Sequence, residues 1–326
     1  MDTYVHGDMG LRIQWDKANK FYLAEGRMRD YVDYAETKTG DCHEPWEVDS
    51  HSLTYMEQWR REFCDGDAKT HDWKWEWANG RRAEGNVANT WDEVKTLASE
   101  GWAGGVERIA DMANELRSAV PETEDITPRY VWTEQGDEFD IHRMWNGEFE
   151  KMFYGRDETV APGPRIVNLV APVGGHAGQG DEALFWLGAT TLVLADVLEK
   201  AGYRVGIKGY NAATHGRGTT SCAVNLLKTP DQHVQLAAIA TAMCLPVYFR
   251  AVGFRWKGRA PFDIGSGWGS PAYAEKDARL RKHMEREGML DDTSILVHEV
   301  RDKEACIKEV RRIVKVIEAM RPQVAA

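Results

Sequence analysis

The second half of the chain alternates short apolar runs with longer segments in which apolar residues recur at helical spacing. The short runs predict buried strands, and the longer segments predict helices that cover a sheet. The expected strands are 166–171, 203–209, 219–228 and 294–298. The expected helices are 182–201, a long helix starting at 229–231 that Pro246 kinks or breaks, and 303–320 with Asp302 as its N-cap. This alternation predicts an α/β domain with a mostly parallel sheet flanked by helices.

The first half has a different pattern. About 80 polar and aromatic residues with weak periodicity open the chain. Thr90, with Glu93 three positions later, forms a capping box that predicts a helix over 91–100. Apolar residues at helical spacing predict a second helix over 105–118. A short strand at 129–133 and a short helix at 141–145, with Asp140 as its N-cap, follow. We therefore expect a Trp-rich, mainly helical or irregular N-terminal region.

Charge and tryptophan divide the chain near the two prolines of 160–164. Residues 1–160 hold 35 acidic and 19 basic side chains, whereas residues 161–326 hold 17 and 22. Ten of the 13 tryptophans lie before residue 160. These differences predict two regions, 1–160 and 161–326, joined at this loop. The formal net charge of −11 disfavours general binding to nucleic-acid phosphates.

The N-terminal segment, the longest apolar stretch and the spacing of the cysteines predict a cytoplasmic location with reduced thiols. Met1–Asp8 lacks the basic and apolar stretches of a secretory signal. The longest uncharged apolar stretch, 183–195, is shorter than the roughly 20 residues that cross a bilayer, so no membrane contact is expected. No CxxC pair occurs, which disfavours a zinc cage and a disulfide framework. The cysteines are Cys42, Cys64, Cys222, Cys244 and Cys306.

The succession of strand, loop, long helix, strand, strand and helix from residue 166 resembles the opening of the von Willebrand factor A-type fold. In that fold the first strand ends in an Asp-x-Ser-x-Ser loop that holds a divalent metal. Here Ala171, Val173 and Gly175 stand at those three positions and offer no side-chain oxygen. The resemblance implies a degenerate A-like domain that lacks the metal site. We therefore expect no metal and no cofactor.

A second resemblance concerns residues 90–260. Glu100–Ile109, Gly136–Asp140 and Gly147–Met152 look like an uncharacterised family of tailed-phage proteins, and the strand at Ile166 and the segment Ala201–Val205 continue the pattern. The resemblance implies a phage origin and a location in the host cytoplasm. It carries no assigned activity.

The loop after the strand 166–171 is rich in glycine and precedes a helix, where backbone amides often bind an anion. It matches neither the P-loop nor the dinucleotide fingerprint. The candidate binding-loop residues are Val173, Gly174, Gly175, Gly178 and Gly180. The candidate catalytic residues, expected at the same edge of the sheet, are His176, Asp181 and His215. Exposed loop histidines and a flexible loop are the alternative interpretation.

Basic and aromatic side chains interleave farther along the chain. The candidate residues for single-stranded nucleic acid are Arg250, Arg255, Trp256 and Lys257. The same cations could instead complement the carbonyl groups at a helix end. Ser221 lacks the flanking glycines of a nucleophile elbow, so a hydrolase triad has no support.

Together these observations favour a phage-encoded intracellular adaptor that acts through protein contacts. Because members of the A-type fold often work beside AAA+ ATPases of the MoxR or cobalt-chelatase type, the resemblance implies such an ATPase, or a host protein, as the partner. The expected contact edge is formed by 173–180 and 211–218. Two alternatives stay open: an enzyme acting on nucleotides or nucleic acid at the same loop edge, and a virion component.

Overall fold

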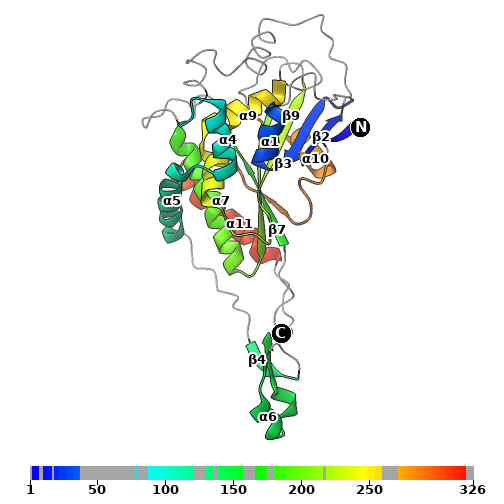
Figure 1. The fold of residues 1–326 in the computed structure, drawn as a ribbon, viewed down its shortest axis with the longest axis vertical. Coiled ribbons are helices and arrows are strands. Elements are labelled where there is room, and N and C mark those ends of the chain that lie inside the picture. The colour runs from blue at the N-terminus through cyan, green and yellow to red at the C-terminus, as the bar shows by residue number, and fades with distance from the viewer. Residues whose placement is uncertain are drawn as a thin grey trace, which may run out of the picture.

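The computed structural model of the chain describes residues 2–6, 10–16, 18–36, 78, 87–119, 130–134, 138–156, 166–174, 180–215, 218–258 and 271–320. These residues form a main body around one large sheet and a small unit with a sheet of its own (Figure 1).

The large sheet has seven strands in the order β1-β2-β3-β9-β8-β7-β10. Their bounds are β1 Asp2–His6, β2 Leu11–Asp16, β3 Phe21–Gly26, β7 Ile166–Pro172, β8 Arg204–Thr214, β9 Thr220–Lys228 and β10 Ser294–Leu296. The pairs β3/β9, β7/β8 and β7/β10 are parallel, and the pairs β1/β2, β2/β3 and β8/β9 are antiparallel. The predicted α/β class is confirmed.

Most helices pack on one face of this sheet, over a continuous apolar core. They are α1 Met28–Glu36, α4 Trp91–Glu100, α5 Val106–Ala119, α7 Asp181–Lys200, α8 Leu236–Ile239, α9 Pro246–Gly258 and α11 Lys303–Met320, with the short turns η3 Ala103–Gly105 and η5 Ala240–Cys244, the latter a π-helix. The other face carries α10 Ala278–Arg286 over a second, smaller core. Alternate strand residues supply the two cores: Leu169 packs in the first and Val170 in the second.

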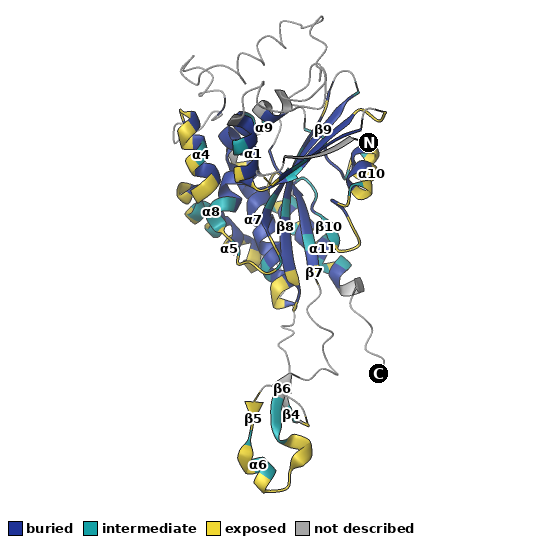
Figure 2. Ribbon diagram, turned by 45° about the vertical axis from the view of Figure 1, so that its right-hand side comes forward, coloured by how far each residue is buried: buried dark blue, intermediate teal, exposed yellow. Residues whose placement is uncertain are grey.

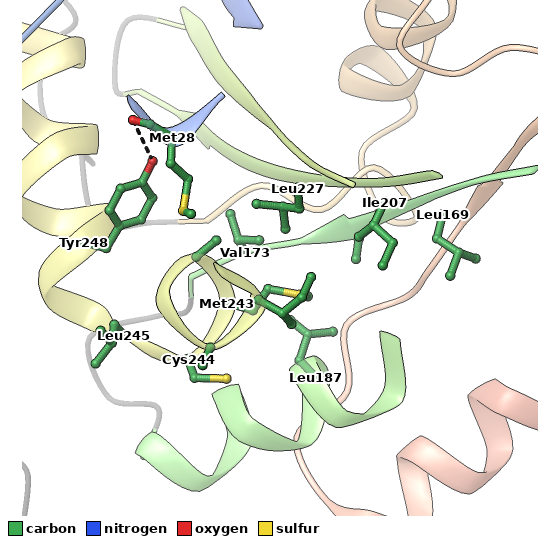
Figure 3. Packing of buried hydrophobic residues seen from close by; sticks show 14 of the residues in the cluster. Met28, Leu169, Val173, Leu187, Ile207, Leu227, Met243, Cys244, Leu245 and Tyr248 are labelled. Atoms are coloured by element: carbon green, nitrogen blue, oxygen red, sulfur yellow. Dashed lines mark hydrogen bonds between the residues drawn. The ribbon is translucent and has the colours of Figure 1, made fainter. Parts of the chain in front are cut away.

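Figure 3 shows part of the larger core, where η5 lies between α7 and the sheet. Gly188 of α7 permits this close packing, because an added Cβ would lie 2.8 Å from Ile109 Cδ1 and 3.0 Å from Cys244 Sγ. At the rim of the core, the Tyr248 hydroxyl of α9 donates to Asn225 Oδ1 of β9 at 2.9 Å. The core therefore ties α5, α7, α9 and the strands into one body.

Local sequence signals account for several element ends. The Thr90 hydroxyl accepts a hydrogen bond from Glu93 N at 3.2 Å, and the Thr90 amide donates one to Glu93 Oε2 at 3.2 Å. The predicted capping box of α4 is therefore confirmed. Asp302 accepts from Ala305 N at 2.8 Å and caps α11, whose predicted bounds are also confirmed. Pro246 begins α9 after a break at Leu245, as expected.

The predicted division at residue 160 does not separate two bodies. Residues 2–36, expected to be helical or irregular, supply β1, β2, β3 and α1, and β3 pairs with β9 from Phe21↔Thr220 to Gly26↔Asn225. Helices α4 and α5 pack over the same core as α7 and α11.

Two predicted boundaries also differ. The polar segment from Asn211 to Thr214 continues β8, because its backbone pairs with Ala223 to Thr220 of β9. The helix expected from residues 229–231 begins at Leu236. Among the described residues, no single helix is long and apolar enough to cross a membrane, although the bent pair Leu236–Cys244 and Pro246–Gly253 reaches that length and composition together.

The small unit comprises residues 130–134 and 138–156 and is called the inserted unit here, because it lies in the chain between α5 and β7. Its sheet has the order β4-β6-β5, with β4 Tyr130–Thr133, β5 Glu138–Phe139 and β6 Phe153–Arg156. Helix α6 Ile141–Trp145 and the turn η4 Phe149–Lys151 join β5 to β6. Figures 1 and 2 show the unit apart from the main body.

Candidate functional site

The predicted binding loop begins at the carboxyl end of β7. Val173 N donates to Tyr210 O at 2.7 Å, and Asn211 Nδ2 donates to Val173 O at 3.1 Å, so the start of the loop is tied to β8. Gly174 is buried with φ +80°, and an added Cβ would lie 2.8 Å from Asn211 Nδ2 and 3.2 Å from the Phe249 ring. Gly174 is therefore a packing position, and both Val173 and Gly174 are buried. The interpretation as a flexible loop stays a prediction.

The remaining loop candidates divide into those described and those that are not. Gly180 is exposed at the N-cap of α7, with open space around it. Asp181 is the first residue of α7. Gly175, His176 and Gly178 lie outside the described residues, so the predicted grouping of His176 with Asp181 and His215 stays a prediction.

His215 has a different environment from the exposed loop histidine that one interpretation expected. It is 2% exposed and lies directly after β8, where its amide donates to Thr219 O at 2.8 Å. His215 Nε2 lies 2.8 Å from the Ser221 hydroxyl oxygen, and Ser221 is fully buried. An imidazole at this distance is able to accept a serine proton, but burial of both groups keeps a substrate carbonyl from the hydroxyl. The pair joins the two ends of the β8–β9 turn.

The predicted nucleic-acid residues lie on α9. Trp256 is fully buried, with its ring stacked on Tyr22 at a centroid distance of 4.8 Å and edge-on to Tyr31 at 6.3 Å. The prediction that Trp256 stacks on a base is therefore wrong, because its ring belongs to the core. Arg250 is half-buried, with its guanidinium carbon 5.9 Å from the Phe249 ring centre. Arg255 and Lys257 belong to α9, but their side chains are outside the described set.

Charged groups near the end of β10 form a paired cluster. The Glu299 carboxylate forms ion pairs with Lys276 Nζ at 2.6 Å and with Arg301 NH2 at 2.6 Å. Burial alone would raise the pKa of Glu299, but the hydrogen bonds from Lys276 and Arg301 outweigh burial and lower it. The cluster is thus an ion-paired structural contact. Within the described ranges, no three His, Cys, Asp or Glu side chains are grouped so as to hold a metal ion.

The inserted unit shows the opposite arrangement, with apolar side chains at the surface. None of its described side chains is buried (Figure 2). Phe139 is 49% exposed, Ile141 44%, Trp145 71% and Phe149 60%. Among the described residues, the main body has one large apolar side chain of comparable exposure, Ile166 at 46%. Among the described residues, the exposed large apolar side chains are therefore concentrated in the inserted unit.

The inserted unit holds its shape through a few surface contacts. Phe139 and Phe153 pair at 5.2 Å between ring centres, and Trp132 and Tyr154 pair at 5.0 Å. The Arg143 guanidinium lies 4.3 Å from the centre of the Trp132 ring. These contacts join side chains of the unit, and none of its described side chains is buried.

The termini of α6 explain the local fold of the unit. Asp140 accepts hydrogen bonds from His142 N at 2.9 Å and from Arg143 N, which confirms the predicted N-cap. Sequence reasoning explained Asp140 but did not single out the neighbouring aromatic residues. A usable signal was present, because Phe139 and Phe149 each stand between two acidic residues, a context that a core position rarely has.

Comparison with known proteins gives a family but no activity. No curated protein and no solved structure matches the chain. A family model described as "Domain of unknown function (DUF7192)" matches residues 49–319, across the predicted boundary at residue 160 and through the whole inserted unit. The match covers well over half of the 326 residues, and the chain therefore belongs to the DUF7192 family.

Proposed function

We propose that this protein is an adaptor that acts through protein contacts, and that the inserted unit makes the principal contact. The observation that carries this proposal is the exposure of Phe139, Ile141, Trp145 and Phe149 in a unit with no buried described side chain. Clustered exposed apolar side chains mark interaction sites on protein surfaces. Full burial of an exposed apolar side chain of this size contributes about 1.5–3 kcal/mol, and covering these half-exposed side chains contributes a part of that.

The stability of the unit supports the same proposal. A small sheet needs a hydrophobic face packed on another element to be stable in water. None of the described side chains of the inserted unit is buried against another element. Six of these side chains are nevertheless aromatic: Trp132, Phe139, Trp145, Phe149, Phe153 and Tyr154. A partner that binds the folded unit stabilises it by mass action. Binding would thus complete a fold that the unit cannot complete alone.

The main body serves in this proposal as a degenerate von Willebrand A-like platform in a phage-encoded protein of the host cytoplasm. The succession β7, α7, β8 and β9 supports that likeness. Ala171 and Val173, at two positions of the family's metal loop, are buried apolar residues. The proposed partner class is an AAA+ ATPase or a host protein, as the resemblance implies. The enzyme and virion alternatives stay predictions.

The test isolates partners with the tagged full-length chain from infected host lysate and identifies them by mass spectrometry. Each recovered protein is then purified and its affinity measured for the wild type, for a Phe139→Ser/Trp145→Ser double variant, and for Ile166→Ser as the matched control. The proposal expects a purified partner that the double variant loses and the control retains. Recovery of the chain alone, or a partner that binds all three equally, would overturn it.

A further inference from the structure

We infer that the partner offers the inserted unit an apolar groove rimmed by lysine and arginine. This inference rests on the proposed function, and concerns the chemistry of the surface that covers the exposed apolar side chains. The observation behind it is the pattern of charge around those side chains.

Carboxylates flank the exposed aromatic residues. Phe139 stands between Glu138 and Asp140, and Phe149 stands between Glu148 and Glu150. Glu138, Glu148 and Glu150 are exposed, and Asp140 is half-exposed. Phe139 and Phe149 are thus each flanked in the sequence by two acidic residues.

The charges of the unit are only partly compensated within it. Arg143 NH1 lies 3.0 Å from Glu148 Oε2, and Arg143 Nε lies 3.7 Å from Asp140 Oδ2. Glu138 and Glu150 make no ion pair with any described residue, and Lys151 offsets part of their charge. Glu138 and Glu150, which stand beside Phe139 and Phe149 in the sequence and are exposed, are called the acidic rim here. Opposite charge on a partner would steer association and fix its register.

The acidic rim also decides between classes of occupant. Phosphates of nucleic acid and anionic lipid headgroups would be repelled by Glu138 and Glu150. A second copy of the chain would bring the same acidic rim against itself, in a protein whose formal net charge is already −11. A protein surface with apolar pockets and a basic rim would cover the exposed apolar side chains and also pair with the acidic residues beside them.

The test measures binding of labelled model peptides to the full-length chain by fluorescence anisotropy. The probe is an amphipathic helical Leu/Lys peptide of about 18 residues, or five turns. Its controls are a Leu/Glu peptide with the same apolar face and a Ser/Lys peptide with the same charge. We expect the Leu/Lys peptide to bind at least about tenfold more tightly than either control, because neither control provides both features.

Three variants separate the two halves of the inference. Trp145→Ser/Phe149→Ser leaves the charge unchanged and should weaken Leu/Lys binding by about tenfold or more. Glu138→Gln/Glu150→Gln leaves the apolar surface unchanged and should reduce the loss of affinity between low salt and roughly 0.5 M salt. Ile166→Ser, an exposed apolar site on the main body, should leave both properties unchanged.

The outcomes distinguish failure of this inference from failure of the adaptor proposal. Equal binding of the Leu/Lys and Leu/Glu peptides, or Leu/Lys binding that survives Trp145→Ser/Phe149→Ser, would overturn the inference. A wild-type dimer in sedimentation equilibrium that Trp145→Ser dissociates would overturn it in favour of a second copy. If a purified partner is still lost by Phe139→Ser/Trp145→Ser in those cases, the adaptor function stands.

Discussion

The main body and the inserted unit treat the same kinds of side chain in opposite ways. In the main body, Trp256 is fully buried against Tyr22, and the polar pair His215 and Ser221 is buried as well. In the inserted unit, Trp145 is 71% exposed. A body that buries its reactive and aromatic groups is suited to be a scaffold, whereas a unit that exposes aromatic rings is suited to bind. This contrast is the reason for proposing that the inserted unit makes the contact with a partner.

The two tryptophans give the largest test of this contrast. Trp256→Ala should lower the free energy of unfolding by about 3–5 kcal/mol, because it leaves a cavity beside Tyr22 and Tyr31. Trp145→Ala should change it by less than about 0.5 kcal/mol, because the side chain is largely in solvent. Urea denaturation of the two variants measures both values. Equal destabilisation would show that the inserted unit is part of the main core, contrary to the proposal.

A second comparison concerns two glycines near the start and end of the predicted binding loop. Gly174→Ala should destabilise the protein by about 1–3 kcal/mol, because φ is +80° and the new Cβ would lie 2.8 Å from Asn211 Nδ2. Gly180→Ala should have little effect, because φ is −69° and the surrounding space is open. Thermal denaturation compares them. A Gly174→Ala protein as stable as the wild type would instead favour the interpretation of this segment as a flexible loop.

Helix caps offer a smaller test of whether the two regions unfold separately. Thr90→Ala removes the cap of α4 in the main body and should cost about 1 kcal/mol of global stability. Asp140→Ala removes the cap of α6, which packs on η4 of the inserted unit, and should leave global stability unchanged while speeding amide exchange in 141–145. Hydrogen exchange with mass spectrometry resolves the two. A global effect of Asp140→Ala would couple the unit to the body.

The sequence predicted best what local chemistry determines. The capping box Thr90–Glu93 and the N-caps Asp140 and Asp302 are set by residues two to three positions away, and all three are observed. The pairing of Leu23 with Cys222 depends on residues nearly 200 positions apart, which no local pattern encodes. The place of β3 beside β9 was missed for that reason, whereas the β1/β2 and β2/β3 pairs are local antiparallel pairs that the weak periodicity of the segment did not indicate.

The candidate site shows the same limit. Trp256 lies on the 13-residue helix α9 and Trp145 on the five-residue helix α6, each beside a basic or polar residue. Nothing local indicates that Trp256 is buried by Tyr22 and that Trp145 is exposed. Likewise the contact of His215 with Ser221 arises from the tight β8–β9 turn, which brings residues six positions apart together. Exposure and pairing of this kind are properties of the folded chain.

The smallest expected effect concerns pH and the second face of the sheet. His283 of α10 is 7% exposed and stacks on Phe21 at 4.2 Å, and burial, followed by the charges of Arg286 and Arg279, lowers its pKa. Asp16 and Glu287 oppose this shift without reversing it. The unfolded chain therefore binds a proton at this residue more readily than the folded protein does.

The contribution of His283 to stability should accordingly be complete above the unfolded pKa of about 6.5 and be lost as pH falls toward the lower folded pKa. His283→Phe keeps a ring on Phe21 but removes the titration, so its unfolding free energy should vary less between pH 7 and pH 5 than that of the wild type. His142→Phe, at an exposed position of the inserted unit, should retain the wild-type pH dependence. The opposite result would be a His283→Phe variant that keeps the wild-type pH dependence of the unfolding free energy and a His142→Phe variant that loses it. That result would place the proton-linked stability in the inserted unit and not at the buried His283 of the main body.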